Sequence, residues 1–262
     1  MIYETIAVAD EGAVRTITLN RPERRNAMTS AMQDELTSAM DAAAASPGCD
    51  VLVLTGAGEA FCAGLDLEQL KGLVGRTAEE HRADAERIAR LFRMLYELPL
   101  PTIAAVNGAA VAGGTGLATI CDFTLAVPEA RFGYTEVRIG FVPALVSAFL
   151  ALQVGDKRAR GLLLTGRLFG AEEAREMGLV SEVVGREGLA DRVRELAKAL
   201  GANSPQSLAM TKRLMADQNR AWLDAAIATA MEANARSRGN ADFAEGVTAF
   251  LEKRRPVWTR SS

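Results

Sequence analysis

The first half of the chain shows apolar patterns that predict strands and helices in turn. Residues 3–9 and 13–19 flank the turn signal Asp10-Glu11-Gly12, which is typical of a β-hairpin. Residues 49–56 and 102–108 are short, mainly apolar runs, as expected of strands buried on both faces. Residues 122–127 and 130–137 resemble further strands. Together these runs predict a sheet covered by helices.

Two helices in this half carry sequence signals for their first turns. Residues 30–45 have Met32, Leu36 and Met40 at helical intervals, and Ser30 and Gln33 stand at the spacing of a capping box. Thr77 and Glu80 show the same spacing before a second apolar stripe. That stripe, which consists of Ile88, Leu91, Phe92 and Leu95, stops before Pro99. We therefore expect a long amphipathic helix that ends there.

After Pro143 few segments have the apolar pattern of a strand, and most show helical periodicity. Asn203-Ser204-Pro205 interrupts the chain before two last helical stretches, at 207–218 and 223–237. The carboxyl-terminal third is therefore predicted to be a helical layer.

Composition and charge narrow the possible functions. The 262 residues are 49% hydrophobic and carry 30 basic and 33 acidic side chains, a formal net charge of -3. A near-neutral chain without blocks of like charge gives little support to nucleic-acid binding. The three cysteines, Cys49, Cys62 and Cys121, match neither a disulfide framework nor a zinc ribbon. No signal peptide and no apolar run long enough to span a bilayer are present, so we expect a cytoplasmic protein that does not enter the membrane.

Common cofactor and nucleophile motifs are missing. The glycine pairs at 56–58 and 114–116 lack the third glycine of a dinucleotide-binding loop, and neither a phosphate loop nor G-x-S-x-G is found. His81 is the only histidine, and the charged residues around it predict a solvated helix face. An enzyme with this sequence must rely on carboxylates, backbone dipoles or a bound cofactor.

Two glycine-rich stretches, at 55–70 and 106–122, each leave an apolar strand and enter a predicted helix. Backbone N–H groups at a helix start are unpaired, and small side chains let a ligand approach them. Two such N–H groups brought together could stabilise a developing oxyanion.

Several segments in order resemble the crotonase superfamily, the enoyl-CoA hydratases and isomerases. They are LNRPERRNAM, FCAGLDL, AAVNGAAVAGGTGLATICD, FGYTEVRIGFVP, LLLTGRLFGAEEAREMGLVSEVV and AFLEKRR. The resemblance implies an α/β fold in which a β-β-α spiral core with the thioester site occupies residues 1–200. A helical trimerisation region would occupy residues 201–262, giving a homo-oligomer that is a trimer or a dimer of trimers.

The resemblance also assigns the site. An acyl-CoA thioester oxygen would lie between the N–H groups of Leu65 and Gly113, with no permanently bound cofactor and no metal, and coenzyme A would be part of the substrate. The residues implied in binding the substrate are Ala63, Leu65, Asp66, Leu67, Gly113, Gly114 and Lys253. Lys253 matches a position that in some relatives reaches a neighbouring subunit's CoA phosphates. We interpret Asp66 as a helix cap as well.

The catalytic carboxylates depart from the usual hydratase pattern. The second glutamate of well-studied hydratases matches Glu136, whereas the first falls on Gly116. Glu136 alone would act as acid and base, and burial beside an acyl pocket should raise its pKa. We expect an enoyl-CoA hydratase. Its substrate would be a straight acyl chain of fatty acid metabolism or, equally compatible with the sequence, a methyl-branched chain from amino-acid breakdown. A Δ3,Δ2-enoyl-CoA isomerase, a CoA-binding protein with little activity and an RNA-binding protein are the alternatives. A salt bridge of Glu136 with Arg138 or another arginine, on a solvated strand, is the structural alternative for that residue. Thr115 and Tyr134 are further candidates for orienting water.

Overall fold

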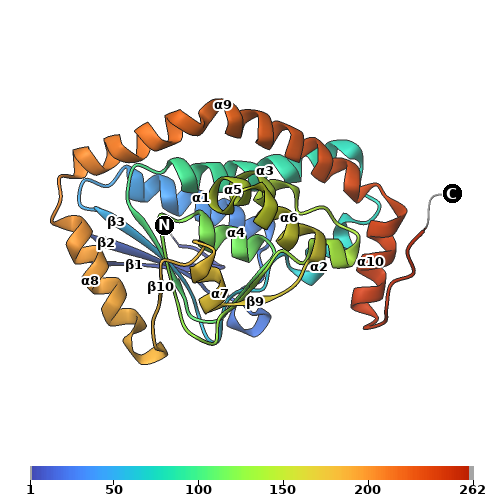
Figure 1. Cartoon of the computed structure of the whole chain (residues 1–262), viewed down its shortest axis with the longest axis horizontal. Coiled ribbons are helices and arrows are strands. Elements are labelled where there is room, and N and C mark those ends of the chain that lie inside the picture. Colours follow the sequence, from blue (N-terminus) through green and yellow to red (C-terminus); the bar gives the residue numbers. More distant parts are fainter. Residues whose placement is uncertain (1, 260–262) are drawn as a thin grey trace.

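The computed structural model describes residues 2–259, without the side chain of Leu67, and contains two sheets (Figure 1). The larger sheet has the strand order β1-β2-β3-β5-β7-β10, and the smaller has β4-β6-β8-β9. The strands of the larger sheet are β1 (Ile6–Glu11), β2 (Val14–Leu19), β3 (Val51–Gly56), β5 (Thr102–Val106), β7 (Phe123–Ala126) and β10 (Glu182–Val183). Those of the smaller sheet are β4 (Ala60–Cys62), β6 (Ala109–Val111), β8 (Arg131–Gly133) and β9 (Phe169–Gly170).

Ten α-helices in the described residues cover these sheets and extend beyond them. They are α1 (Ser30–Ala44), α2 (Leu67–Leu73), α3 (Ala78–Glu97), α4 (Gly113–Ile120), α5 (Ala144–Val154), α6 (Asp156–Thr165), α7 (Ala171–Glu176), α8 (Leu189–Gly201), α9 (Pro205–Arg238) and α10 (Ala241–Leu251). A short 3₁₀ helix, η2 (Glu136–Ile139), follows β8. The mixed α/β architecture with a helical carboxyl-terminal region confirms the predicted fold class.

A strand of the larger sheet is followed by a strand of the smaller sheet and then by helix, three times in succession. The repeats are β3-β4-α2-α3, β5-β6-α4 and β7-β8-α5-α6. β3, β5 and β7 run parallel, and so do β4, β6 and β8. Strands buried on both faces need no polar alternation, which explains the continuous apolar runs in the sequence. This winding places the ends of β4, β6 and β8 side by side.

The opening hairpin forms as predicted, with β1 antiparallel to β2 and Glu11 opposite Val14. The Thr77 and Glu80 capping box is also confirmed. The other predicted capping box is wrong: the N-cap of α1 is Thr29, whose side chain accepts a hydrogen bond from the Met32 N–H. The Ser30 hydroxyl instead bonds to Gln69 on α2.

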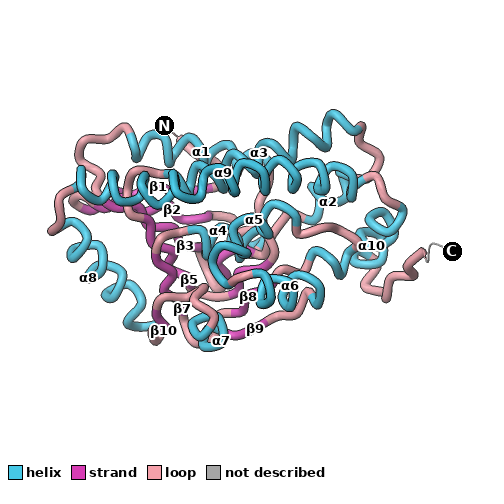
Figure 2. Tube along the Cα trace, turned by 45° about the horizontal axis from the view of Figure 1, so that its top comes forward, coloured by secondary structure: helices cyan, strands magenta, loops and turns pink. Residues whose placement is uncertain are grey.

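The carboxyl-terminal helices differ from the prediction in continuity. The two expected stretches form one helix, α9, which packs along α3 and α5 (Figures 1 and 2). A further helix, α10, packs on α2 and η2. α9 therefore joins the outer helical layer, and α10 brings the end of the chain against η2.

Helix α3 is not solvated where the sequence predicted it to be. His81 is 3% exposed, because α9 lies against this face of α3. Burial, followed by the nearby charges of Arg238 and Arg76, lowers the pKa of His81. The prediction of an exposed histidine is wrong, since it took the charged neighbours as a sign of solvent.

Candidate active site

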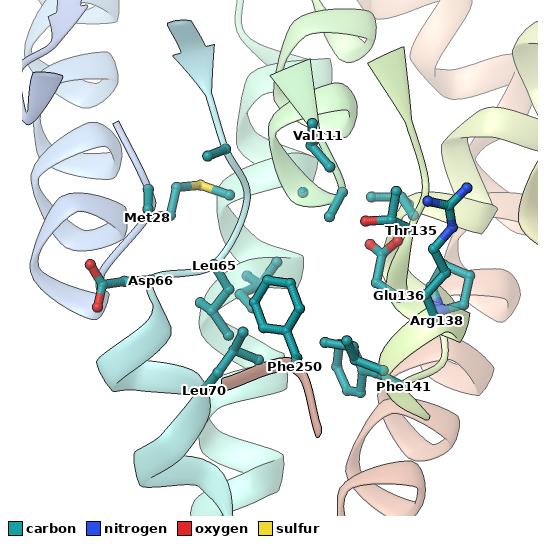
Figure 3. Close-up of a pocket in the computed structure, with 18 of the residues that line it drawn as sticks. Met28, Leu65, Asp66, Leu70, Val111, Thr135, Glu136, Arg138, Phe141 and Phe250 are labelled. Carbon is teal, nitrogen blue, oxygen red and sulfur yellow. The ribbon is translucent and has the colours of Figure 1, made fainter. Parts of the chain in front are cut away.

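A cavity of about 790 Å³ opens where the smaller sheet, α2, η2 and α10 meet (Figure 3). Figure 3 shows Glu136 and Phe141 on one side of this cavity and Leu65 and Leu70 on the opposite side. Apolar side chains dominate the lining, among them Met28, Leu65, Leu70, Ile88, Phe92, Val111, Ile139, Phe141, Val142, Leu145, Val146 and Phe250. Such a wall suits an acyl chain and lowers the local dielectric around any charge.

Glu136 is a buried carboxyl in the wall of this cavity. It begins η2 and is 8% exposed, and its Oε2 atom has no hydrogen-bond partner among the described residues. Burial raises the pKa of Glu136 to about 7, and a backbone hydrogen bond within the residue opposes that rise. Glu136 is buried and forms no ion pair with Arg138 or with another arginine among the described residues, so the structural alternative is wrong. The predicted rise in pKa is confirmed, and a pKa near neutrality suits proton transfer in both directions.

The two predicted backbone donors are free to bind a ligand. Met28 pairs with the chain around Leu65 by accepting from the Asp66 N–H and donating to the Gly64 carbonyl, which leaves the Leu65 N–H unused in the described part of the chain. Gly113 is the first residue of α4, where an N–H has no partner within the helix. Both residues line the cavity. Each residue therefore offers an N–H group without a backbone partner among the described residues at the cavity wall.

The backbone before Gly113 is held in an unusual conformation. Ala112 has φ 52° and ψ -123°, outside the regions that residues with a Cβ prefer, and its N–H bonds to the Gly133 carbonyl at 2.6 Å. Next along the chain, a Cβ at Gly114 would lie 2.3 Å from the Cys62 carbonyl oxygen. Only glycine at 114 lets α4 begin this close to β4. The resemblance places Gly114 among the substrate-binding residues, but Gly114 does not line the cavity.

Gly116 lies where the resemblance expects a first glutamate, and hydrophobic side chains fill the adjoining space. A Cβ at this position would lie 2.7 Å from Val146 Cγ1 and 3.3 Å from the Phe92 ring. Both neighbours belong to the cavity wall. An apolar surface therefore stands where the first glutamate is expected.

The remaining predicted residues divide between the cavity and its surroundings. Ala63 and Asp66 line the cavity, whereas Lys253 does not line it in its own chain. Asp66 caps α2 as predicted, accepting from the Glu68 N–H, and it also pairs with Arg21 at 2.9 Å. Leu67 begins α2, and its side chain lies outside the described part of the structure.

Thr115 and Tyr134 are not placed to orient water. Thr115 bonds to the Ala110 and Gly133 carbonyls, the Tyr134 hydroxyl contacts Thr119, and neither lines the cavity. Both were wrong as candidates, because the Thr115 hydroxyl bonds to backbone carbonyls of β6 and β8 and the Tyr134 hydroxyl contacts the Thr119 hydroxyl on α4.

Some polar residues of the cavity were missed by the sequence reasoning. They are Glu23, Arg24, Arg25, Gln33, Asn234, Arg238 and Arg254. The run PERRNA at 22–27 was quoted for the resemblance, and its basic residues were the available signal for Arg24 and Arg25. Gln33, Asn234 and Arg238 lie on helices whose packing alone brings them to the cavity, so no local pattern indicated them.

Comparison with known proteins adds a family assignment to this geometry. The model of the family described as enoyl-CoA hydratase/isomerase matches residues 9–261. The chain belongs to this family. Among the relatives, a Thermus thermophilus protein named "Putative enoyl-CoA hydratase" is 45% identical, over 94% of this chain and 98% of its own length. An Escherichia coli protein named 1,2-epoxyphenylacetyl-CoA isomerase is 35% identical, over 95% of this chain and 96% of its own.

Solved structures of family members have the same fold. The crystal structure of an enoyl-CoA hydratase/isomerase from Xanthobacter autotrophicus Py2 superposes with a TM-score of 0.89 at 33% identity, over 96% of this chain and 94% of the other. The predicted membership of the crotonase superfamily is therefore confirmed. The family contains both hydratases and isomerases. Membership of the family therefore does not identify the reaction, which must be inferred from the site.

Proposed function

We propose that this protein is an enoyl-CoA hydratase that adds water reversibly to a 2-enoyl-CoA with one glutamate. The single observation that carries the proposal is the buried Glu136 carboxyl in an apolar cavity whose wall also presents the Leu65 and Gly113 N–H groups. The names of the Thermus thermophilus relative and of the Syntrophomonas wolfei crotonyl-CoA hydratase support hydration.

The thioester oxygen would accept hydrogen bonds from the N–H groups of Leu65 and Gly113. These donors stabilise the negative charge that develops on that oxygen, and loss of one such donor typically costs about 3–4 kcal/mol of transition-state stabilisation. Because the donors belong to the backbone, they need no polar side chain in the apolar wall.

Glu136 would serve first as base and then as acid. Its carboxylate takes a proton from water as the water oxygen bonds to C3 of the acyl chain, and the electron pair of the double bond moves to the thioester oxygen. The protonated Glu136 then returns the proton to C2 as the enolate collapses. Water is thereby added across the double bond, and the glutamate is regenerated. A pKa of about 7 makes both protonation states accessible near neutral pH.

Isomerisation of a 3-enoyl-CoA is the second candidate, and the environment of Gly116 favours it. Moving a double bond requires one group that removes a proton and returns it, and Val146 and Phe92 occupy the space beside Gly116, where the first glutamate is missing. Incubation with crotonyl-CoA and with 3-hexenoyl-CoA separates the two reactions. Hydration adds the mass of water to crotonyl-CoA, whereas isomerisation converts the 3-enoyl chain without a change of mass.

Binding of either thioester without turnover would instead indicate a CoA-binding protein with little activity. Acetoacetyl-CoA, a thioester that neither hydration nor isomerisation consumes, provides the binding measurement. Hydration of crotonyl-CoA supports the proposal, and its absence contradicts it.

We also propose a homo-oligomer built through the carboxyl-terminal helices, a trimer or a dimer of trimers. Apolar side chains on α9 are exposed, with Met210 at 65% and Leu214 at 57%, as expected of a surface that another copy covers. The proposed division remains a core of residues 1–200 and an oligomerisation region of residues 201–262. Within residues 2–259 no helix has the length and hydrophobicity needed to cross a membrane. Light scattering at several protein concentrations measures the oligomer.

A further inference from the structure

Three buried polar side chains of the cavity wall have no part in the proposed chemistry. Gln33 on α1 is 0% exposed, Asn234 on α9 is 3% exposed and Arg238 on α9 is 4% exposed. The atoms without a partner among the described residues are Gln33 Nε2 and Oε1, Asn234 Oδ1, and Arg238 Nε and Nη2. Buried polar groups in native proteins are nearly always hydrogen-bonded, so this set indicates a ligand or water beside it.

Ion pairs bring the helices that carry these side chains to one corner of the site. Arg238 Nη1 bonds to Asp84 Oδ2 on α3 at 2.5 Å. Arg87, also on α3, lies 3.6 Å from Asp84 and 3.1 Å from Asp34, which is next to Gln33 on α1. Ion pairs therefore join α1, α3 and α9. We call Gln33, Asp84, Arg87, Asn234 and Arg238, which lie on these three helices, the polar corner.

The guanidinium of Arg238 has one edge free. Asp84 occupies Nη1, and Phe141 lies 5.3 Å from the guanidinium carbon with its ring facing the group. The unpartnered Nε and Nη2 form the side edge of the guanidinium, whose two parallel N–H groups match the two oxygens of a carboxylate.

The buried charges at this edge are those of Arg238 and Asp84. Arg87 is partly exposed, and Arg76 and Asp34 are exposed, so their charges are screened by solvent. Glu80, on the same helix as Asp84, is fully exposed to solvent, and its charge is screened. His81 adds no charge near neutral pH, since burial lowers its pKa. Asp84 binds Nη1 alone, so the side edge of the Arg238 guanidinium is left without an anionic partner among the described residues.

We propose that the polar corner binds a carboxylate at the far end of the acyl group, so that the preferred substrates are CoA thioesters of dicarboxylic acids. The inference rests on the proposed function in one respect: the acyl chain must enter the cavity that Glu136 lines. The Arg238 side edge would hold the two carboxylate oxygens, with the Gln33 amide as a further donor. An apolar chain of equal length would leave these groups unpaired.

Binding of saturated thioesters tests this inference without requiring turnover. Succinyl-, glutaryl- and adipyl-CoA are compared by calorimetry with butyryl-, pentanoyl- and hexanoyl-CoA, which match them in carbon number. We expect at least one dicarboxylic thioester to bind about tenfold or more tightly than its match, because an unpaired buried guanidinium edge is costly.

Three variants identify the groups responsible. Arg238→Lys keeps the positive charge opposite Asp84 but removes the side edge of the guanidinium. Gln33→Leu removes the unpartnered side-chain amide without adding a charge. Each should reduce the preference for the dicarboxylic thioester, and Arg238→Lys should abolish it. Arg236→Met, at an exposed arginine of the same helix, is the matched control and should leave the preference unchanged.

The outcomes separate this inference from the proposed function. Equal affinity in all three matched pairs, or a preference that survives both Arg238→Lys and Gln33→Leu, would overturn the inference and leave the hydratase proposal standing. Tighter binding of 4-hydroxybutyryl-CoA than of every dicarboxylic thioester would also overturn it, since a neutral hydroxyl would then be the ligand. Failure of both series to bind would overturn the proposed function together with the inference.

Discussion

Replacing Glu136 by Gln should stabilise the fold, and the gain should depend on pH. The folded-state pKa of Glu136 is about 7, against 4.5 for an ordinary glutamate. Because the pKa is raised, folding favours the protonated carboxyl. The stability that protonated Glu136 contributes to the fold is therefore fully present below pH 4.5 and is lost as pH rises through 7. The rise of the pKa from 4.5 to about 7 corresponds to a loss of about 3 kcal/mol in the free energy of unfolding above pH 7. The glutamine side chain of the variant stays neutral and does not incur this cost.

Urea unfolding at fixed protein concentration measures the effect. At pH 4 the free energies of unfolding of the two proteins should agree closely, and at pH 8 the variant should be more stable by about 3 kcal/mol. Glu232→Gln, at an exposed position of α9, is the control and should show no gain that depends on pH. A gain of equal size at both values of pH would refute the reasoning, because it would mean that burial does not perturb the Glu136 carboxyl.

Three further predictions concern the same region. Gly116→Glu should destabilise the protein by about 1–3 kcal/mol in urea unfolding, since its Cβ would lie 2.7 Å from Val146 Cγ1; unchanged stability would show that the wall yields easily. Ala112→Gly should raise the free energy of unfolding by about 1 kcal/mol, because glycine adopts φ 52° without strain; a lower melting temperature would contradict this. In the hydration direction kcat/KM should rise as pH increases through about 7, since Glu136 must be ionised to accept the water proton. A flat profile between pH 5 and pH 9, followed with crotonyl-CoA, would exclude that role.

Local signals in the sequence predicted much of the fold. The hairpin, the capping box at Thr77 and the buried strands depend on residues close together in the chain, and each formed. The α1 N-cap was misplaced by one residue because Thr29 and Ser30 are both suitable caps, and the contact of Ser30 with Gln69 on α2 is not local. Short-range patterns thus predicted the elements better than their ends.

The site was predicted in part, and the missing part depends on tertiary packing. Glu136 and the glycine-rich helix start were found because motif order and backbone chemistry point to them. Arg238 and its partner Asp84 are 154 residues apart, and only the packing of α9 on α3 joins them. The same packing buries His81, whose charged neighbours suggested solvent. A pattern within one helix cannot show which face a distant helix will cover.

The role of Glu136 is tested most directly by the activity of the Glu136→Gln variant. Hydration of crotonyl-CoA is followed in parallel with the affinity for acetoacetyl-CoA, which reports whether the cavity still binds a thioester. The account predicts that turnover is lost while the affinity is largely kept, because the glutamine side chain fills the same space but cannot accept the proton from water. Near-normal turnover in a variant that binds the thioester normally would contradict it.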